Sequence, residues 1–253
     1  MNNKVVWIEL EGGVAVVRLS RGVTNALNLE LVAGLSQVIN EAKLDAAICG
    51  LVLASANDKF FSIGFDIPQL YHLPPDEFAI FYRAFNRLCL DLYTLPKPTA
   101  AAITGHATAG GCILALCCDY RMIAQGHKLM GLNEIKLGVP APYFADRILR
   151  QLVGQRLARD IIDTGAFYNP EQSLDLGLID QVLPLAEVIP AAIEKCHGLG
   201  SHPRKAFAEI KRYRTGHVSQ EAEPRLEETD RAFIDCWYAQ TARERLQEAI
   251  SKF

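Results

Sequence analysis

The apolar residues of this chain follow two different periods, and the shorter one marks the strands. Short apolar runs rich in β-branched residues are typical of strands buried in a sheet. The first two, Val5–Leu10 and Val14–Leu19, are separated by Glu11-Gly12-Gly13, a spacing typical of a β-hairpin. Further strands are predicted at Ile48–Ser55, Thr99–Ile103, Tyr120–Ala124 and Leu178–Leu183.

Longer segments between these strands carry apolar residues three or four positions apart, which is the period of an amphipathic helix. The first such segment follows Asn28 and Thr24, either of which could cap its start, and it places Leu31, Leu35 and Val38 on one face. Other helices are predicted at Asp76–Tyr93, Ala145–Thr164, Leu185–Gly198 and Leu226–Phe253, with a short one after Asn169. Strands that alternate with helices predict an α/β core with right-handed crossovers.

Composition narrows the function classes. Half of the 253 residues are hydrophobic, which is enough for one large core or for one core with a small appendage. The net charge of −3 and the pI of about 6.1 disfavour nucleic-acid binding. No apolar run reaches the roughly 18 residues of a membrane span, and no leader signal opens the chain. We therefore expect a cytoplasmic protein with neither a nucleic-acid nor a membrane partner.

Neither the cysteines nor the histidines form a metal-binding pattern. The seven cysteines include no C-x-x-C pair, so we expect free thiols in a reducing compartment. The histidines are isolated, and His106 is expected to have a packing role. Basic residues are densest in Arg204-Lys205 and Lys211-Arg212, with Arg214 close behind. A solvated helix face explains this stretch, and attraction of an anionic ligand such as a nucleotide phosphate is the alternative.

Candidate chemistry concentrates between Ile103 and Tyr143. Gly110 and Gly111 precede an apolar run and bring the backbone close to whatever lies beside it, leaving N–H groups free at a helix start. Such groups suit an oxyanion. Glu134 stands alone between Leu132 and Leu137, and if it is buried it would be a perturbed base. A small-residue helix packed closely on a sheet, with a solvated Glu134, is an equally open interpretation.

Several motifs together resemble the crotonase (enoyl-CoA hydratase/isomerase) superfamily over nearly the whole chain. They are NALN, FSIGFDI, GHATAGGCILALCCDYR, LNEIKLGV and GLIDQVLP. Within the superfamily the sequence is most similar to the mitochondrial-type Δ3,Δ2-enoyl-CoA isomerases. The resemblance implies a superhelical spiral of ββα units over residues 1–195 and a helical trimerisation region over 196–253. It also implies a homotrimer or a dimer of trimers.

The resemblance further implies an acyl-CoA thioester substrate, with no cofactor besides the coenzyme A that the substrate itself carries. By this resemblance, the backbone N–H groups of Ile63 and Gly110 hold the thioester oxygen. Glu134 is the acid/base that moves a proton from C2 to C4, and Asn133 either contacts substrate or is an ordinary turn amide. Tyr143 is expected in the pocket wall. Contacts with the CoA ester are assigned to Asn25, Ala26, Leu27, Ile63, Gly64, Phe65, Asp66, Ile67, Gly110 and Asn133.

Ile113 discriminates between the reactions of this superfamily. The hydratases place a second glutamate just after Gly-Gly-Cys, where it helps to activate water, and this chain has Ile113 there. The single acid favours an isomerase. Enoyl-CoA hydration by a reduced site and acyl-CoA hydrolysis stay open as alternatives, as does a binding member of the superfamily without catalysis.

Overall fold

A computed structural model describes residues 5–251, and its strands form two sheets. The larger sheet has the order β1-β2-β3-β5-β7-β9, in which β1 and β2 are antiparallel and the other neighbours are parallel. The smaller sheet, β4-β6-β8, is parallel. The strands are β1 (Val6–Glu11), β2 (Val14–Leu19), β3 (Gly50–Ser55), β4 (Phe60–Ser62), β5 (Thr99–Ile103), β6 (His106–Thr108), β7 (Tyr120–Ala124), β8 (Met130–Gly131) and β9 (Gln181–Leu183).

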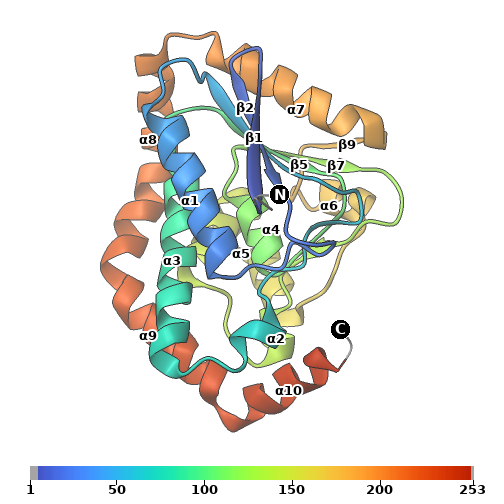
Figure 1. Cartoon of the computed structure of the whole chain (residues 1–253), viewed down its shortest axis with the longest axis vertical. Coiled ribbons are helices and arrows are strands. Elements are labelled where there is room, and N and C mark those ends of the chain that lie inside the picture. Colours follow the sequence, from blue (N-terminus) through green and yellow to red (C-terminus); the bar gives the residue numbers. More distant parts are fainter. Residues whose placement is uncertain (1–4, 252–253) are drawn as a thin grey trace.

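Helices cover both faces of the larger sheet (Figure 1). The longer helices are α1 (Leu29–Leu44), α3 (Pro75–Tyr93), α4 (Gly110–Leu116), α5 (Tyr143–Thr164), α7 (Leu185–Gly200), α8 (Arg204–Ala222), α9 (Leu226–Tyr238) and α10 (Gln240–Ile250). Short helices are α2 (Ile67–Leu70), η1 (Glu134–Leu137), α6 (Pro170–Asp175) and η2 (Glu223–Arg225).

The alternation of strand side chains explains the two hydrophobic clusters. In β2, Val14 and Val16 face α7 and pack with its Val188, whereas Ala15 and Val17 face the larger cluster beneath α1 and α3. Both sides of the strand are therefore buried, as expected for a sheet covered on two faces. The predicted α/β class is confirmed.

Local signals placed most element ends correctly. The Asn28 side chain caps α1 by accepting a hydrogen bond from the Leu31 N–H at 3.0 Å. Asn169 and Gln172 form a capping box at the start of α6. The C-terminal prediction was wrong in one respect, because Leu226–Phe253 is not one helix. Ala239 is extended (φ −64°, ψ 143°) and separates α9 from α10, which turns to pack against η1; Phe253 lies outside the described residues.

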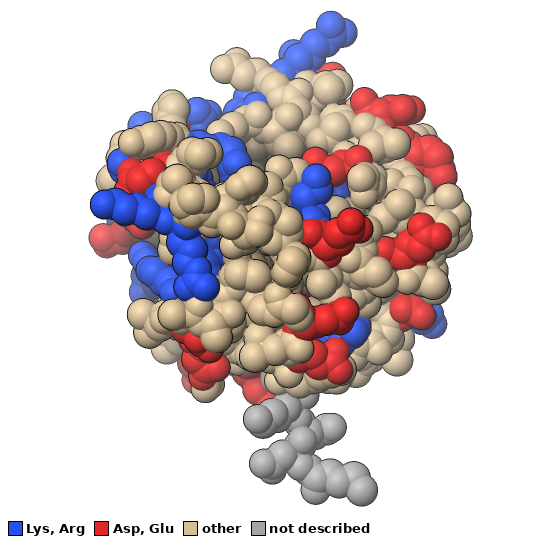
Figure 2. All heavy atoms as spheres, turned by 90° about the horizontal axis from the view of Figure 1, so that it is seen from above, with Lys and Arg blue, Asp and Glu red and all other residues tan. Residues whose placement is uncertain are grey.

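The basic stretch lies on α8, and for Lys211 the solvated-face interpretation was wrong. Lys211 is only 1% exposed, and its ammonium group lies 2.8 Å from the Asp119 carboxylate, which also pairs with Arg214. The stretch therefore ties α8 to the start of β5 and β7. Figure 2 shows that elsewhere basic and acidic side chains share the face seen from above, with basic ones denser on one side.

Candidate active site

A cavity of about 1280 Å³ lies among α2, α4, η1, α9 and α10, and its lining changes character with depth. The exposed rim carries charged and polar side chains: Lys59, His127, Lys136, Glu244, Arg245 and Glu248. The buried part of the lining is mostly apolar, with Thr108 and the Glu134 carboxylate as polar members, and its apolar members include Ile67, Ile113, Val139, Phe233 and Trp237. A cavity of this kind suits a ligand with a charged end and an apolar end.

The Gly110 loop brings backbone to the cavity wall. The chain leaves β6, passes through Ala109 at the strained φ of 48° and enters α4 at Gly110. A Cβ on Gly110 would lie 2.9 Å from Leu27 Cδ1 and 3.2 Å from Phe65 Cδ1, so a larger residue there would require the Leu27 side chain to shift. Between residues 5 and 251 the Gly110 N–H has no protein acceptor. This group is available to a ligand oxygen.

The Ile63 backbone departs from the expectation. Ile63 follows β4 and lines the cavity with its side chain, but its N–H donates to the Thr24 carbonyl at 3.0 Å. The cause is the turn at Gly64 (φ 98°), which brings this segment against the loop that precedes α1. An N–H already paired in this way reaches a second acceptor only as a shared, weaker hydrogen bond. The structure therefore offers Gly110 as the free donor and Ile63 as an occupied one.

Glu134 opens η1 and is a buried carboxylate. The residue is 7% exposed, lines the cavity and has no hydrogen-bond partner for Oε2 among the described residues. Burial raises the pKa of Glu134 from its usual 4.5 to about 7. The solvated interpretation of Glu134 was wrong. A carboxyl group with a pKa near neutrality both accepts and returns a proton readily at physiological pH.

The raised pKa predicts that Glu134 destabilises the fold at neutral and higher pH. The folded pKa of about 7 lies above the unfolded value of 4.5, so this cost is complete above pH 7 and vanishes as pH falls through 4.5. At about 1.4 kcal/mol per pKa unit, the difference is about 3 kcal/mol. We expect Glu134→Gln to raise the free energy of unfolding by up to this amount at pH 8, relative to its effect at pH 4.5. Urea unfolding of both proteins at the two pH values measures it, and an equal effect at both values would contradict the burial of the charge.

The segment 25–27 is buried and does not line the cavity, and its contact with CoA stays a prediction of the sequence. Asn25 is fully buried at φ 46°, and its amide nitrogen donates to Ser55 Oγ and to the Phe61 carbonyl. Ala26 and Leu27 are buried too, and none of the three lines the cavity. Asn25 instead holds the turn before α1 against β4.

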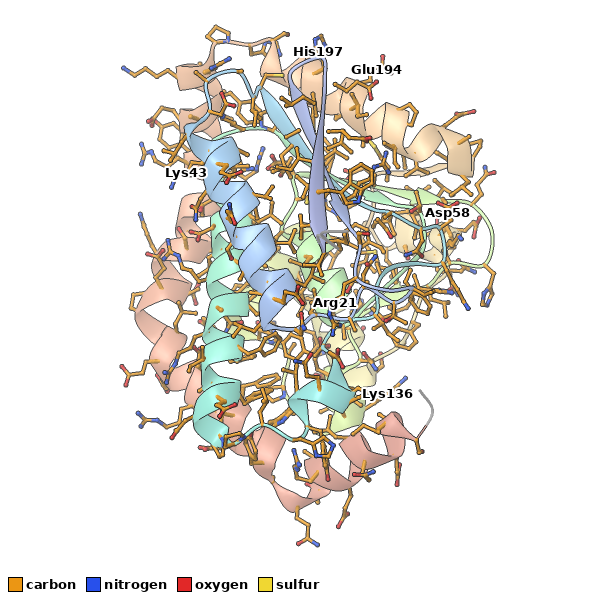
Figure 3. All side chains as sticks on the ribbon, viewed as in Figure 1. Arg21, Lys43, Asp58, Lys136, Glu194 and His197 are labelled. Atoms are coloured by element: carbon orange, nitrogen blue, oxygen red, sulfur yellow. The ribbon has the colours of Figure 1, made fainter. Side chains whose placement is uncertain are left out.

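The segment 63–67 reaches the cavity through some of its residues only. Ile63, Phe65 and Ile67 line it, whereas Gly64 and Asp66 do not. The Asp66 carboxylate caps α2 and lies 2.7 Å from the Arg21 guanidinium, which Figure 3 places beside α2. Asp66 therefore has a structural role.

Three further predicted residues have different outcomes. Asn133 lines the cavity, and its buried Oδ1 has no partner in residues 5–251. Tyr143 lies outside the cavity, contrary to the prediction, because its hydroxyl donates to Glu221 at 2.7 Å. The packing role of His106 is supported by its Nδ1, which accepts from the Leu129 N–H at 3.0 Å, although the ring also lines the cavity.

The sequence interpretation missed the contribution of the C-terminal helices. Phe233 and Trp237 of α9 line the deep part of the cavity, and Arg245 of α10 lies at its rim. The Arg245 guanidinium donates to the Lys136 carbonyl at 3.0 Å, and Figure 3 shows Lys136 beside α10. The apolar face of these helices could be predicted from the sequence. The cavity residues that it joins, such as Glu134, are about 100 positions earlier in the chain.

A family model described as enoyl-CoA hydratase/isomerase matches residues 9–253. The chain belongs to this family. The chain is similar to mouse mitochondrial enoyl-CoA delta isomerase 1, with 36% identity over 189 residues that cover 74% of this chain and 65% of the mouse protein. The short-chain-enoyl-CoA hydratase of Clostridium acetobutylicum is 29% identical over 253 residues, covering 100% of this chain and 96% of that protein.

The crystal structure of human mitochondrial delta3-delta2-enoyl-CoA isomerase has the same fold, with a TM-score of 0.94 and 27% identity. The match covers 98% of this chain and 97% of the human chain. The crotonase-type fold that the motifs implied is therefore confirmed. The description of the family model covers both hydratases and isomerases, so membership in the family does not by itself identify the reaction.

Two absences complete the description of the site. No helix within residues 5–251 has the length and hydropathy that crossing a membrane requires. In the same part of the chain, no group of three or more His, Cys, Asp or Glu side chains is arranged to hold a metal ion.

Proposed function

We propose that this protein is a Δ3,Δ2-enoyl-CoA isomerase that uses Glu134 as its single acid/base. The observation that carries the proposal is the pairing of a buried Glu134 with Ile113. Among residues 5–251, three carboxylates line the cavity, of which only Glu134 is buried, whereas Glu244 and Glu248 lie at the exposed rim. Ile113 is 2% exposed and lines the cavity at the position where the family's hydratases carry a second glutamate.

The proposed reaction moves one proton and one double bond. The Glu134 carboxylate takes a proton from C2 of a 3-enoyl-CoA, and the electron pair delocalises onto the thioester oxygen and C4. The protonated Glu134 then returns the proton to C4, which leaves the double bond between C2 and C3. A pKa near 7 suits both steps, because the carboxyl group is neither too weak a base nor too weak an acid at neutral pH.

The dienolate oxygen needs a hydrogen-bond donor, and the Gly110 N–H is our assignment. Removing one such donor typically costs about 10²–10³-fold in kcat. The Ile63 N–H serves as the second donor in this proposal if it shares its hydrogen with the Thr24 carbonyl. The alternative is that substrate displaces that carbonyl. Asn133, whose Oδ1 is buried and unpartnered among residues 5–251, is the candidate for a polar contact with the thioester arm.

The proposal assigns the two ends of the substrate to the two parts of the cavity. The phosphates of coenzyme A suit the rim beside Lys59, Lys136 and Arg245, and the acyl chain suits the apolar depth. Coenzyme A is then part of the substrate, and no further cofactor is proposed. The division at residue 195, the homotrimer or dimer of trimers and the cytoplasmic location stay predictions of the sequence.

The experiment that tests the proposal compares isomerisation with hydration on one preparation. We expect isomerisation of 3-hexenoyl-CoA to exceed hydration of 2-hexenoyl-CoA by at least about 10²-fold in kcat/KM, the lower end of what one general base contributes. Ile113→Glu restores the missing carboxylate, and we expect it to raise hydration by about tenfold or more. Ile113→Gln, which has a similar size and no charge, is the control.

A hydratase is the second candidate, because the Clostridium acetobutylicum relative matches the entire chain. Wild-type hydration as fast as isomerisation would favour it and would overturn the isomerase proposal. Equal hydration by the Glu and Gln variants at position 113 would show that a carboxylate there is not what separates the two reactions.

A further inference from the structure

We propose that Trp237 closes the deep end of the cavity and sets the longest acyl chain that the enzyme accepts. This inference rests on the proposed function, because it assigns the apolar depth of the cavity to the acyl chain. It concerns a residue of α9, about 100 positions away in sequence from Glu134, and it makes Trp237 a specificity residue.

The position of Trp237 supports a closing role. Its side chain is 1% exposed and lines the cavity together with Phe233, which lies one helical turn earlier on α9. The Phe65 ring connects this end to the reacting centre: its centroid is 6.4 Å from the Trp237 ring, and its Cδ1 lies close to Gly110. An acyl chain that starts at the Gly110 N–H and follows Phe65 therefore runs toward Trp237.

The indole is held firmly from behind. Phe78 of α3 stacks on Trp237 with centroids 4.5 Å apart and an interplanar angle of 20°, and Phe78 itself is fully buried and does not line the cavity. Phe233 is fixed in the same way by Tyr82, with centroids 4.1 Å apart. Because packed aromatic side chains cannot move aside without opening a void, this end of the cavity is a rigid wall.

Trp237 acts through its volume. Its buried indole N–H has no acceptor among the side chains and backbone described here, so hydrogen bonding does not explain a tryptophan at this position. A leucine there would leave empty space between Phe78 and the cavity, continuous with the acyl end. Extra methylene groups of a longer chain would fill that space, and one methylene in an apolar pocket typically changes kcat/KM by about tenfold or more.

The test measures chain-length preference in wild type, Trp237→Leu and Trp237→Phe. The readout is kcat/KM for 3-dodecenoyl-CoA divided by that for 3-hexenoyl-CoA on the same preparation, a ratio that does not depend on the folded fraction. We expect it to rise at least about tenfold in Trp237→Leu and by less in Trp237→Phe. Trp7→Leu is the matched control, because Trp7 lies on β1 beneath Arg18 and away from the cavity, and its ratio should equal that of wild type.

A binding measurement separates this inference from the proposed function. Dissociation constants for saturated hexanoyl-CoA and dodecanoyl-CoA report the acyl pocket whether or not the enzyme isomerises. If the wild type binds these esters without isomerising 3-enoyl-CoA, the proposed function is overturned. A larger increase in affinity for dodecanoyl-CoA than for hexanoyl-CoA in Trp237→Leu would still support Trp237 as the end of the acyl pocket. An unchanged preference in Trp237→Leu, in turnover and in binding, overturns the inference.

Discussion

Glu134→Gln should lower kcat/KM for 3-enoyl-CoA isomerisation by about 10²–10⁴-fold, the range of one general acid–base residue. The substituted amide would keep the shape of the side chain and lose the ability to take a proton from C2. No second carboxylate is buried in the described cavity lining to replace it, because Ile113 occupies the nearby position. Steady-state turnover of 3-hexenoyl-CoA by purified protein measures the effect.

The control for this variant is Glu244→Gln at the exposed rim of the same cavity. It removes the same charge and should leave kcat/KM within about threefold of wild type, since exposed charges have small effects. The expected stability gain of Glu134→Gln above pH 7 means that unfolding cannot account for its loss of activity. Turnover by Glu134→Gln close to that of wild type would refute the assignment of the base.

Gly111→Ala should cost about 3 kcal/mol or more of the free energy of unfolding, the upper part of the range for overpacking. A Cβ there would lie 2.2 Å from the Ser62 carbonyl oxygen and 2.8 Å from its carbonyl carbon. Ser62 cannot yield easily, because its hydroxyl donates to the Asn25 carbonyl at 2.8 Å within a fully buried turn. The variant therefore separates α4 from β4, the two elements that carry Gly110 and lead to Ile63.

Gly216→Ala in α8 is the matched control for Gly111→Ala. A Cβ on Gly216 would meet nothing within 4 Å, so the substitution should stabilise the helix by up to about 1 kcal/mol through helix propensity. Urea unfolding curves of the three proteins at one pH provide the comparison. Equal stabilities for the two alanine variants would show that the close approach of Gly111 to Ser62 does not exist in solution.

Local physical chemistry explains what could be predicted from the sequence. The hairpin at Gly12-Gly13, the Asn28 cap and the strand at Thr99–Ile103 depend on neighbours in the chain, and each is present. The glycines before the apolar helix indicated either a free N–H group or close packing, and within the described residues the structure shows both, with an unpaired N–H at Gly110 and close packing at Gly111. The apolar neighbours of Glu134 in sequence left its burial open, and the structure shows that it is buried.

Contacts between distant segments explain what could not be predicted. The Ile63 N–H donates to the Thr24 carbonyl, which is 39 positions earlier in the sequence. Buried Lys211 pairs with Asp119, which is 92 positions earlier. The Asn25 side chain points into the protein, and only its hydrogen bonds with Ser55 and Phe61, which are 30 and 36 positions away, show this. Trp237 lies on the apolar face of α9. The cavity that this face lines is formed mostly by elements far earlier in the chain.

The most direct test of Glu134 as the single acid/base follows deuterium from C2 to C4 of the substrate. Glu134 is buried and its Oε2 is unpartnered among the described residues, so the proton it takes from C2 is shielded from bulk water until it is returned. A 3-enoyl-CoA that carries deuterium at C2 should therefore yield, in ordinary water, a 2-enoyl-CoA with deuterium at C4 after a single turnover, and mass spectrometry with NMR can locate it. A product whose C4 contains hydrogen from water alone would contradict a single, enclosed acid/base.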